Sequence, residues 1–290
     1  MRRSTLLFTT DNGPTKAFAQ FLRDVQVPGN DLISIDAALQ ARFFQKGPDG
    51  KPLERWELEA SAVMCPADRI RLHLRLCGFI DCSIPRCWAA EYADWPGALL
   101  PRALARLKDL NTVWKSGVRW NQTVVHGGKR PLLKDRESPN AMISLVEEVF
   151  DCEVTADEAD RHYDRDLQTE LQMMEALWHL APFDQELRAI PVTFVDAPMK
   201  PPLKEGDSPV RPSTEDTILE WLQGNPTPGH HLLSSGAPYG MAQDEAFWML
   251  LESHGHTVET FGHAAPDLPI ETFMREVAGT VNRIRKSRLG

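Results

Sequence analysis

Residues 122–128 have the sequence Gln-Thr-Val-Val-His-Gly-Gly, a short β-branched run that ends at two glycines. This composition predicts a buried strand, and the glycines mark its end. Similar runs occupy residues 191–196, Pro-Val-Thr-Phe-Val-Asp, and residues 231–234, His-Leu-Leu-Ser. Stretches with helical spacing of apolar residues separate these runs. The alternation predicts parallel strands joined by right-handed helical crossovers.

The helical stretches support the same fold class. The last of them carries an apolar stripe formed by Ile270, Phe273, Met274, Val277, Val281 and Ile284. Another helix is predicted over residues 157–181, and a third begins at Ser213, a suitable N-cap with Asp216 three residues later. We therefore expect an α/β protein with three layers, α/β/α, and a mostly parallel, Rossmann-like sheet covered on both faces.

The N-terminal portion is less regular than the rest of the chain. Residues 5–10 predict a short buried strand. Residues 53–80 have a helical pattern in which Leu72, Leu76 and Phe79 share one apolar face. We expect residues 1–91 to form an N-terminal strand and helical extension, and residues 92–290 to form the Rossmann-like domain.

Composition and charge limit the classes of partner. The 290 residues are 42% hydrophobic and 25% charged, as in globular proteins, and the formal net charge is −9. A chain of this charge is poorly suited to nucleic acid or to an anionic membrane surface, so we expect neither as a partner. No apolar run approaches the ~18 residues that cross a bilayer, and the first apolar run is too short for a signal sequence. We expect a cytoplasmic protein.

The cysteines do not form a recognisable metal-binding pattern. The chain has five, and Cys77, Cys82 and Cys87 recur at regular spacing. Zinc ribbons carry paired C-x2-C knuckles, which are absent from this sequence. We therefore expect buried structural thiols and assign no metal site.

The predicted topology indicates where a ligand would bind. In an open parallel sheet, ligands bind beyond the carboxyl ends of the strands, at the point where the strand order reverses. Three loops follow predicted strands, at residues 127–130, 196–200 and 234–240. Because parallel strands all end at the same edge, these loops are expected to meet in space.

The first of these loops has the composition of an anion site. Gly127 and Gly128 let backbone N–H groups approach an anion, and Lys129 and Arg130 supply charge for a phosphate or carboxylate. The alternative is a tight turn followed by exposed basic residues. The segment matches neither the dinucleotide fingerprint nor the P-loop, which favours a transferase or hydrolase over an oxidoreductase.

The second loop and the helix after it supply further candidates. Asp196 ends a strand, where it acts either as a ligand or catalytic carboxylate or as a cap for the next turn. Lys200 and Arg211 flank a proline-rich loop and are candidates for binding an anionic group. Thr214 and Asp216 lie in the first turn of a helix whose N-terminus either binds an anion or is capped by its own side chains.

The third loop contains hydroxyl groups. Ser234 and Ser235 end a strand and are expected to line the pocket. A serine hydrolase that uses one of them is an alternative function, although the G-x-S-x-G motif is absent. Gln243 opens the following helix, where it either caps the helix or contacts a polar ligand edge.

Several motifs follow one another in a characteristic order: Arg102, Gly127-Gly128, Glu137, Thr169-Glu170 with Met173-Met174, Asp196, Ser213-Thr214-Glu215-Asp216, and Leu232-Leu233-Ser234-Ser235. Over about residues 92–285 this order resembles the SanA/ElyC/YdcF-like family, a domain of unknown function in which S-x-N-T-x-E-N occupies the place of residues 213–216. The resemblance implies a Rossmann-like fold, with S-adenosylmethionine as a candidate cofactor. It carries site roles over to Gly127, Gly128, Glu137, Glu170, Thr214 and Asp216.

The sequence therefore predicts a small-molecule enzyme or binding protein for an anionic, nucleotide-like ligand. Asp196, Glu137 and Glu170 are the candidates for its acid–base group. A transferase and a hydrolase fit equally well. The other alternative is a non-catalytic module that recruits a protein partner through the N-terminal helical portion and the acidic segment near residue 160.

Overall fold

The computed structural model describes residues 2–44, 65–155, 157, 167–202, 204, 206 and 208–290. The chain forms two compact units, each treated separately below. Unit 1 comprises Met1–Ser83, Gly236–Met249 and Gly262–Gly290, and unit 2 comprises Ile84–Ser235 and Leu250–Phe261. The expected boundary at residue 91 lies close to the one at residue 83, but the two C-terminal segments 236–249 and 262–290 group with the N-terminal portion.

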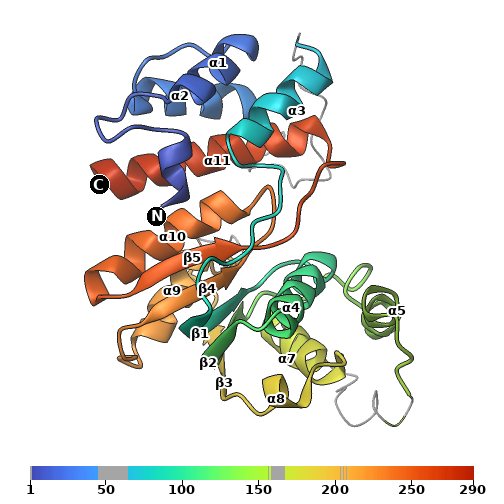
Figure 1. Cartoon of the computed structure of the whole chain (residues 1–290). Helices are drawn as coiled ribbons and strands as arrows, with labels where there is room; N and C mark the ends of the chain where they lie inside the picture. Colours follow the sequence, from blue (N-terminus) through green and yellow to red (C-terminus); the bar gives the residue numbers. More distant parts are fainter. Residues whose placement is uncertain are drawn as a thin grey trace. The chain divides into compact units, whose positions relative to one another are not determined.

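Unit 2 contains a parallel sheet, as the sequence predicted. In the part of the chain that the structure describes, its five strands are β1 (Ala89–Pro96), β2 (Arg119–Gly128), β3 (Val192–Ala197), β4 (His230–Ser234) and β5 (Thr257–Phe261). All neighbouring strands are parallel, in the order β3-β2-β1-β4-β5 (Figure 1). The strand order reverses between β1 and β4, which makes the carboxyl ends of these two strands the topological switch point.

Helices cover both faces of this sheet. The helices of unit 2 are α4 (Leu100–Lys115), α5 (Pro139–Phe150), α7 (Glu170–Leu180), α8 (Gln185–Arg188), α9 (Thr214–Leu222) and the short η3 (Glu252–His254). On one face α4 and α7 pack against Trp95, Val125 and Leu232 in a common apolar core. On the other face lies α9 (Figure 1), whose Trp221 packs edge-on against Tyr92 of β1. The α/β, Rossmann-like, three-layer fold is therefore confirmed.

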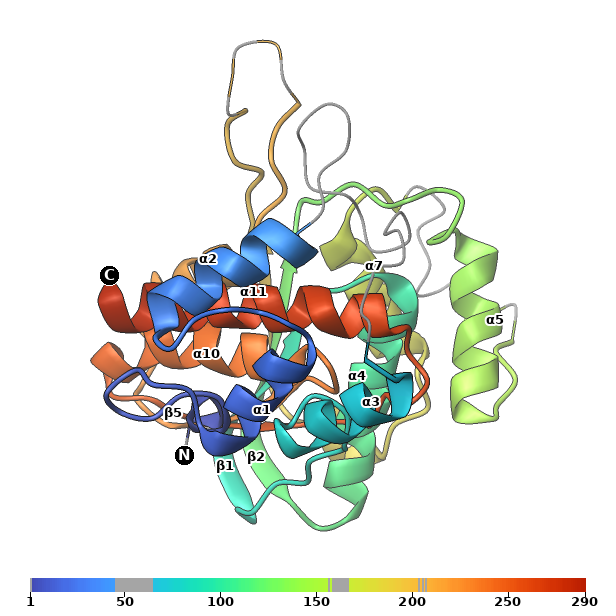
Figure 2. The ribbon, with the colours of Figure 1, turned by 90° about the horizontal axis from the view of Figure 1, so that it is seen from above.

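Unit 1 is built largely from helices. Its elements are η1 (Arg3–Leu6), α1 (Lys16–Asp24), α2 (Leu32–Phe43), α3 (Ala67–Leu76), the first ten residues of α10 (Gly240–Leu251) and α11 (Ile270–Leu289). The predicted stripe of α11 is buried from Phe273 to Ile284, within a core that α1, α2 and α3 share. Helix α2 lies along α11 (Figure 2). The buried Asp36 of α2 accepts hydrogen bonds from Asn282 and Arg285 of α11.

Two predictions for the N-terminal portion were wrong. Residues 5–10 do not form a strand: the chain makes the 3-10 helix η1, and Phe8 forms an isolated bridge with Pro14. An apolar run this short does not distinguish a strand from a buried turn. In α3 the buried side chains are Ile70, His73 and Leu74, whereas Leu72 and Leu76 are exposed. Phe79 is buried, but it follows Gly78 at φ +80°, beyond the end of the helix.

The helix predicted over residues 157–181 is confirmed only from Glu170. Thr169 caps α7 and forms a capping box with Gln172, which fixes this start. Most of the segment before it lies outside the described residues, as does the first part of the helix predicted over 53–80. The start of α9 agrees with the sequence, because Ser213 and Asp216 form the expected capping box.

The cysteine thiols differ in their burial. Cys77 is buried and burial raises its pKa to about 12, whereas Cys82 is exposed and Cys87 is partly buried. The expectation of buried thiols therefore holds for Cys77 and is wrong for Cys82.

Among the described residues, each helix is either too short or too polar to cross a bilayer.

The glycines of β2 give a first test of the packing. A Cβ at Gly127 would lie 2.7 Å from Leu171 Cδ1 and 2.9 Å from the Leu171 Cα of α7, and backbone cannot move aside easily. We expect Gly127→Ala to lower the free energy of unfolding by about 1–3 kcal/mol, because α7 must shift. Urea unfolding followed by circular dichroism measures this change.

Gly279→Ala in α11 is the matched control, because an added Cβ there meets nothing within 4 Å. It should be neutral or stabilising by about 0.5–1 kcal/mol, as expected for a helical glycine. Equal effects of the two substitutions would contradict the close contact between β2 and α7.

Candidate functional site

The switch point of unit 2 contains a helix N-terminus that holds an anion from the protein itself. The N-cap residue of α4, Leu99, makes no side-chain capping bond. Instead the backbone N–H of Leu100 donates to Glu137 Oε1 at 3.3 Å. A helix N-terminus at this point of a Rossmann-like sheet favours negative charge. The carboxylate of Glu137 occupies that position and partly satisfies the helix end.

Arg130 links Glu137 to a second carboxylate. Its Nη1 and Nη2 donate to the two oxygens of Glu137 at 2.8 and 2.9 Å, and its Nε donates to Glu170 Oε1 at 3.2 Å. Arg130 and Glu137 are buried, and Glu137 Oε2 also accepts from the Leu133 N–H at 2.8 Å. Bidentate pairing holds both planes in one orientation. The sequence predicted all three charged residues as site residues, and the structure brings them together.

Glu170 has the electrostatic properties of an acid–base group. Burial raises its pKa, Arg130 lowers it, and the neighbouring Glu137 raises it again, with a net increase above the ordinary value. Its Oε1 is bound by Arg130, whereas Oε2 accepts no hydrogen bond from the described residues, and 13% of the side chain is exposed. A carboxyl group with a raised pKa and a free oxygen can exchange a proton with a bound molecule.

Gly97, directly after β1, makes room for this carboxylate. A Cβ at Gly97 would lie 2.8 Å from both Cδ and Oε2 of Glu170. The turn from β1 into α4 therefore passes directly against the free oxygen of Glu170. Gly97 was not among the residues predicted from the sequence, although a glycine between a strand and a helix in this fold is a typical sign of close approach.

Gly127 and Gly128 lie inside β2 instead of in a turn beyond it. They are paired with Asp196 and Ala197 of β3. The spaces that their side chains would fill are taken by Leu171 on one face and Pro212 on the other. Close packing thus gives both glycines a structural role, and the anion-binding role remains a prediction.

The other charged candidates form pairs at the same edge of the sheet. The Nζ of Lys129 lies 3.6 Å from Asp196 Oδ2, and both side chains are exposed. Lys200 Nζ lies 2.5 Å from Asp216 Oδ2. Burial opposes ionisation of Asp216, but Lys200 and Ser213 more than compensate and lower its pKa.

Thr214 is the first residue of α9, Ser213 is its N-cap, and Asp216 completes the capping box. The backbone N–H and the hydroxyl of Ser213 both donate to Asp216 Oδ2, at 2.6 and 2.7 Å. The capping role considered for Asp216 is therefore observed. Arg211 is exposed just before this helix and contributes positive charge near Glu170.

Ser234 and Ser235 are fully buried and bonded to Arg106, which the sequence analysis missed. Ser234 Oγ donates to the Arg106 carbonyl at 2.8 Å, and Arg106 Nη2 donates to Ser235 Oγ at 3.2 Å. Arg106 Nη1 also donates to the carbonyls of Pro96 and Gly97 at 2.9 and 3.0 Å. Arg106 therefore ties the end of β1 to the end of β4. Neither serine is hydrogen-bonded to a histidine among the described residues, and Gln243 lies in α10 within unit 1.

A second polar group, missed entirely from the sequence, lies within the sheet. Asp94 of β1 is completely buried, and its two oxygens lie 2.7 Å from His126 Nε2 of β2 and 2.7 Å from His231 Nδ1 of β4. His231 Nε2 continues the chain to His256 Nδ1 at 2.9 Å. Charged residues are uncommon inside buried parallel strands, so Asp94 could have been recognised from the sequence as an unusual residue.

His231 connects the buried carboxylate to His256. Its Nδ1 faces Asp94 and its Nε2 faces His256 Nδ1, which also lies 3.2 Å from the Gly229 N–H. The carboxylate of Asp94 is thus bonded to two histidines from the neighbouring strands.

Two pKa values are shifted within this group. Burial by itself would raise the pKa of Asp94, but His231 and His126 lower it to about 2. Burial and then the charge of His231 lower the pKa of His256 to about 4, so His256 stays neutral. Tyr92 stacks on His231 at 4.6 Å between ring centroids and closes this group from one side. We interpret the group as a stabilising ion pair within the sheet.

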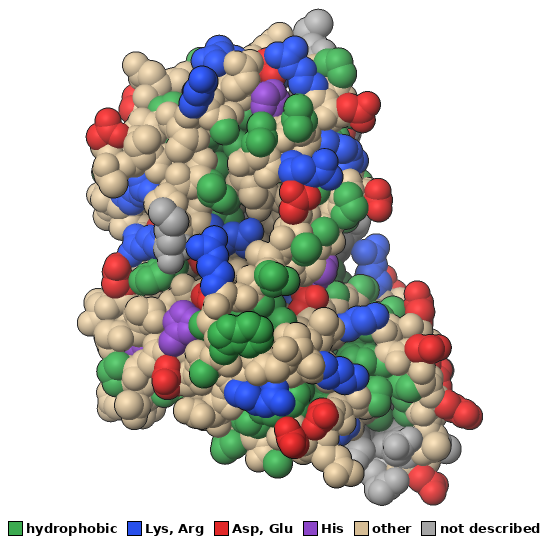
Figure 3. All heavy atoms as spheres, viewed as in Figure 1, with side chains coloured by type: hydrophobic (Ala, Val, Ile, Leu, Met, Phe, Trp, Pro, Cys, Tyr) green, Lys and Arg blue, Asp and Glu red, His purple; other side chains and the backbone are tan. Residues whose placement is uncertain are grey.

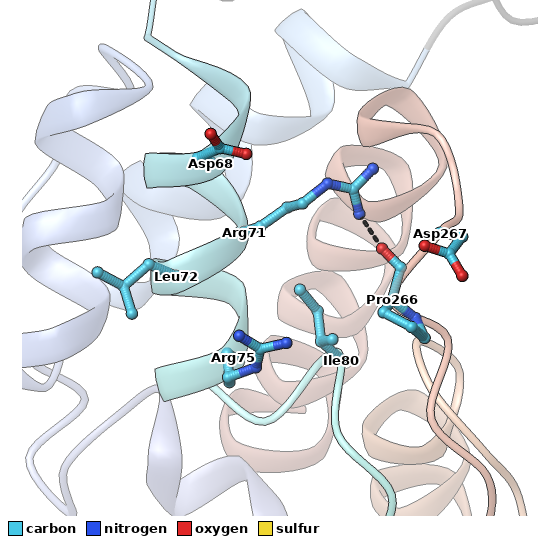
Figure 4. Close-up of a pocket in the computed structure, with 7 residues that line it drawn as sticks. All are labelled: Asp68, Arg71, Leu72, Arg75, Ile80, Pro266 and Asp267. Atoms are coloured by element: carbon cyan, nitrogen blue, oxygen red, sulfur yellow. Dashed lines mark hydrogen bonds between the residues drawn. The ribbon is translucent and has the colours of Figure 1, made fainter.

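A pocket in unit 1 contains none of the predicted site residues. It lies between α3 and the segment 266–267 and is lined by Asp68, Arg71, Leu72, Arg75, Ile80, Pro266 and Asp267 (Figure 4). Arg71 donates to the carbonyls of Pro266 and Leu268, and Arg75 pairs with Asp81 at 2.9 Å. Both arginines of the pocket are thus already bound to the protein.

The charges of the visible surface are mixed. On the face drawn in Figure 3, acidic and basic side chains are interspersed, without a continuous basic tract.

Comparison with protein-family models, with curated proteins and with solved structures finds no match to this chain. The resemblance to the SanA/ElyC/YdcF-like family therefore stays a prediction.

Removal of the buried carboxylate tests the ion pair. We expect Asp94→Asn to lower the free energy of unfolding at pH 7 by about 3–5 kcal/mol, because it breaks the buried pairs that Asp94 forms with His126 and His231. Urea unfolding measures the loss. Asp135→Asn, which changes an exposed carboxylate, should leave stability within about 0.5 kcal/mol. Similar values for both variants would contradict the proposed pairing.

The same group predicts sensitivity to acid. Since the folded pKa of His256 is about 4 and its ordinary value is 6.5, its contribution to stability is present above pH 6.5 and is lost as the pH falls through 4. His256→Asn keeps an acceptor near the Nδ1 position but cannot titrate. The urea midpoint of this variant should fall less between pH 7 and pH 4 than that of the wild type. His179→Asn, at an exposed histidine of α7, should retain the wild-type slope.

Proposed function

We propose that unit 2 binds a small anionic, nucleotide-like molecule at the carboxyl edge of its sheet and acts on it as a transferase or hydrolase, with Glu170 as the acid–base group. The observation that carries this proposal is the pairing of Glu170 and Glu137 through one arginine at the switch point. Two carboxyl groups that share a cation keep one of them poised to gain or lose a proton.

Glu137 and Glu170 have different tasks in this proposal. Glu137 is saturated, because it accepts from Arg130 through both oxygens and from the backbone of Leu100 and Leu133. It therefore positions Arg130. Glu170 keeps one oxygen free beside Gly97 and is the group that would contact the substrate.

The surrounding cations suit an anionic substrate. Lys129 follows β2, and Lys200 and Arg211 follow β3, so all three belong to the edge at which parallel strands end. The side chains of Lys129 and Lys200 are exposed, as is Arg211. A phosphate can compete for Lys129 with the carboxylate of Asp196. A phosphate-bearing, nucleotide-like molecule is the ligand class that this charge favours. S-adenosylmethionine, which the family resemblance suggested, is a second candidate ligand to be tested.

The test begins with binding to the full-length chain. Nucleotides, sugar phosphates and S-adenosylmethionine are screened for an increase in melting temperature, since a ligand of the native state stabilises it by mass action. We expect one class to raise Tm and Lys129→Gln with Arg211→Gln to reduce that shift. Absence of any shift, or an unchanged shift in the double variant, would overturn the proposed binding edge.

The catalytic role of Glu170 is tested separately with the ligand that the screen selects. Conversion of that ligand is followed by mass spectrometry for the wild type, Glu170→Gln and the control Glu186→Gln, which alters an exposed carboxylate of α8. We expect Glu170→Gln to retain binding and to lower turnover about 10²–10⁴-fold, whereas the control stays unchanged. Equal turnover in all three proteins would exclude Glu170 as the acid–base group.

A further inference from the structure

A group of metal-ligating side chains lies at the opposite half of the strands in unit 2. Cys87 immediately precedes β1, His230 is the first residue of β4, and Glu259 lies in β5. One ligand atom from each side chain lies within 4.8 Å of the other two. This group has no signature in the sequence, because the three residues are far apart in the chain and form no spacing motif.

Strand register brings His230 and Glu259 to the same face of the sheet. His230 is paired with Thr257, and Leu232 with Glu259, so His230 and Glu259 are separated by one step of the two-residue repeat. His230 Nε2 lies 3.8 Å from Glu259 Oε2. Cys87 reaches the same point from the segment that leads into β1, the neighbour of β4.

Hydrogen bonds already orient these side chains. His230 Nδ1 lies 2.8 Å from Thr257 Oγ1, which fixes the ring and leaves Nε2 directed at Glu259. The backbone N–H groups of Arg86 and Cys87 donate to the two oxygens of Glu259 at 2.8 and 3.3 Å. Metal-binding histidines and carboxylates are typically held by such outer contacts.

We propose that Cys87 Sγ, His230 Nε2 and a Glu259 carboxylate oxygen form a binding site for a divalent transition-metal ion, with Zn²⁺ as the preferred ion. Thiolate, imidazole and carboxylate are the three ligand types that zinc uses in proteins. Zinc bonds of about 2.0–2.3 Å imply about 3.3–3.5 Å between ligand atoms in a tetrahedron. The observed 3.8 Å between His230 and Glu259 needs only a small contraction, and rotation of Cys87 supplies the third ligand.

The fourth position of the tetrahedron faces solvent. Cys87, His230 and Glu259 are each partly exposed, so water or an external ligand can complete the coordination. Binding forms a Zn–S bond and breaks the S–H bond of Cys87, whose proton passes to the buffer; no electron is transferred. The site goes beyond the proposed function and shares no residue with it.

The test measures Zn²⁺ retained by the full-length chain after dialysis, using elemental analysis, and the spectrum of the Co²⁺-substituted protein. We expect one bound ion per chain and a thiolate-to-cobalt charge-transfer band. Cys87→Ser should abolish the band, and His230→Gln and Glu259→Gln should each weaken Zn²⁺ binding by more than about a hundredfold. Thr257→Val, which removes an outer contact, should weaken it by about 10–100-fold.

Matched controls are Cys82→Ser and His254→Asn, which remove an exposed thiol and an exposed imidazole and should bind Zn²⁺ as the wild type does. Circular dichroism verifies that each variant is folded, and Glu170→Gln should bind Zn²⁺ normally even if the proposed function fails. Absence of stoichiometric Zn²⁺, wild-type retention by the three ligand variants, or equal competition by Mg²⁺ would overturn the site.

Discussion

A buried carboxylate on the central strand constrains the whole of unit 2. Asp94 lies on β1, which pairs with β2 on one side and β4 on the other, and its two oxygens contact one histidine from each neighbour. A slip of either strand by one residue would turn its histidine to the opposite face and leave the charge unpaired. The ion pair therefore fixes the register of the three inner strands.

Register at the centre of the sheet determines what meets at its carboxyl edge. With β1, β2 and β4 aligned, Pro96 and Gly97 end beside Ser235, and Arg106 from α4 bonds to all three. The same alignment places Gly97 against Glu170, the first residue of α7. The edge is thus held rigidly by buried groups, while the cations at its rim stay exposed. A rigid base with exposed charges suits recognition of a small ligand.

The fold and the charged cluster were accessible from sequence by different routes. Parallel strands end at one edge, which placed Arg130 at the expected ligand-binding edge, whereas Glu137 and Glu170 were carried over from the family resemblance. Asp94 and Arg106 were not predicted from the sequence, because their partners, His231 and Ser235, lie more than a hundred residues away and no local pattern indicates the pairing. The error at Leu72 and Leu76 has another origin: several apolar stripes fit a short helix, and only the tertiary contacts select one.

Glu137 and Glu259 lie at opposite halves of this sheet, and the backbone binds both carboxylates in the same way. Each accepts backbone N–H groups through both oxygens, Glu137 at the carboxyl edge and Glu259 towards the strand starts. Glu137 faces a guanidinium, which saturates it and leaves Glu170 as the reactive neighbour. Glu259 instead lies near the Cys87 thiol and the imidazole of His230, with one ligand atom of each within 4.8 Å of the other two. Burial and a hydrogen bond to Glu259 raise the pKa of the Cys87 thiol to about 11, so the thiol proton is shared with this carboxylate. The proposed metal ion would displace that proton and bind all three ligands in its place.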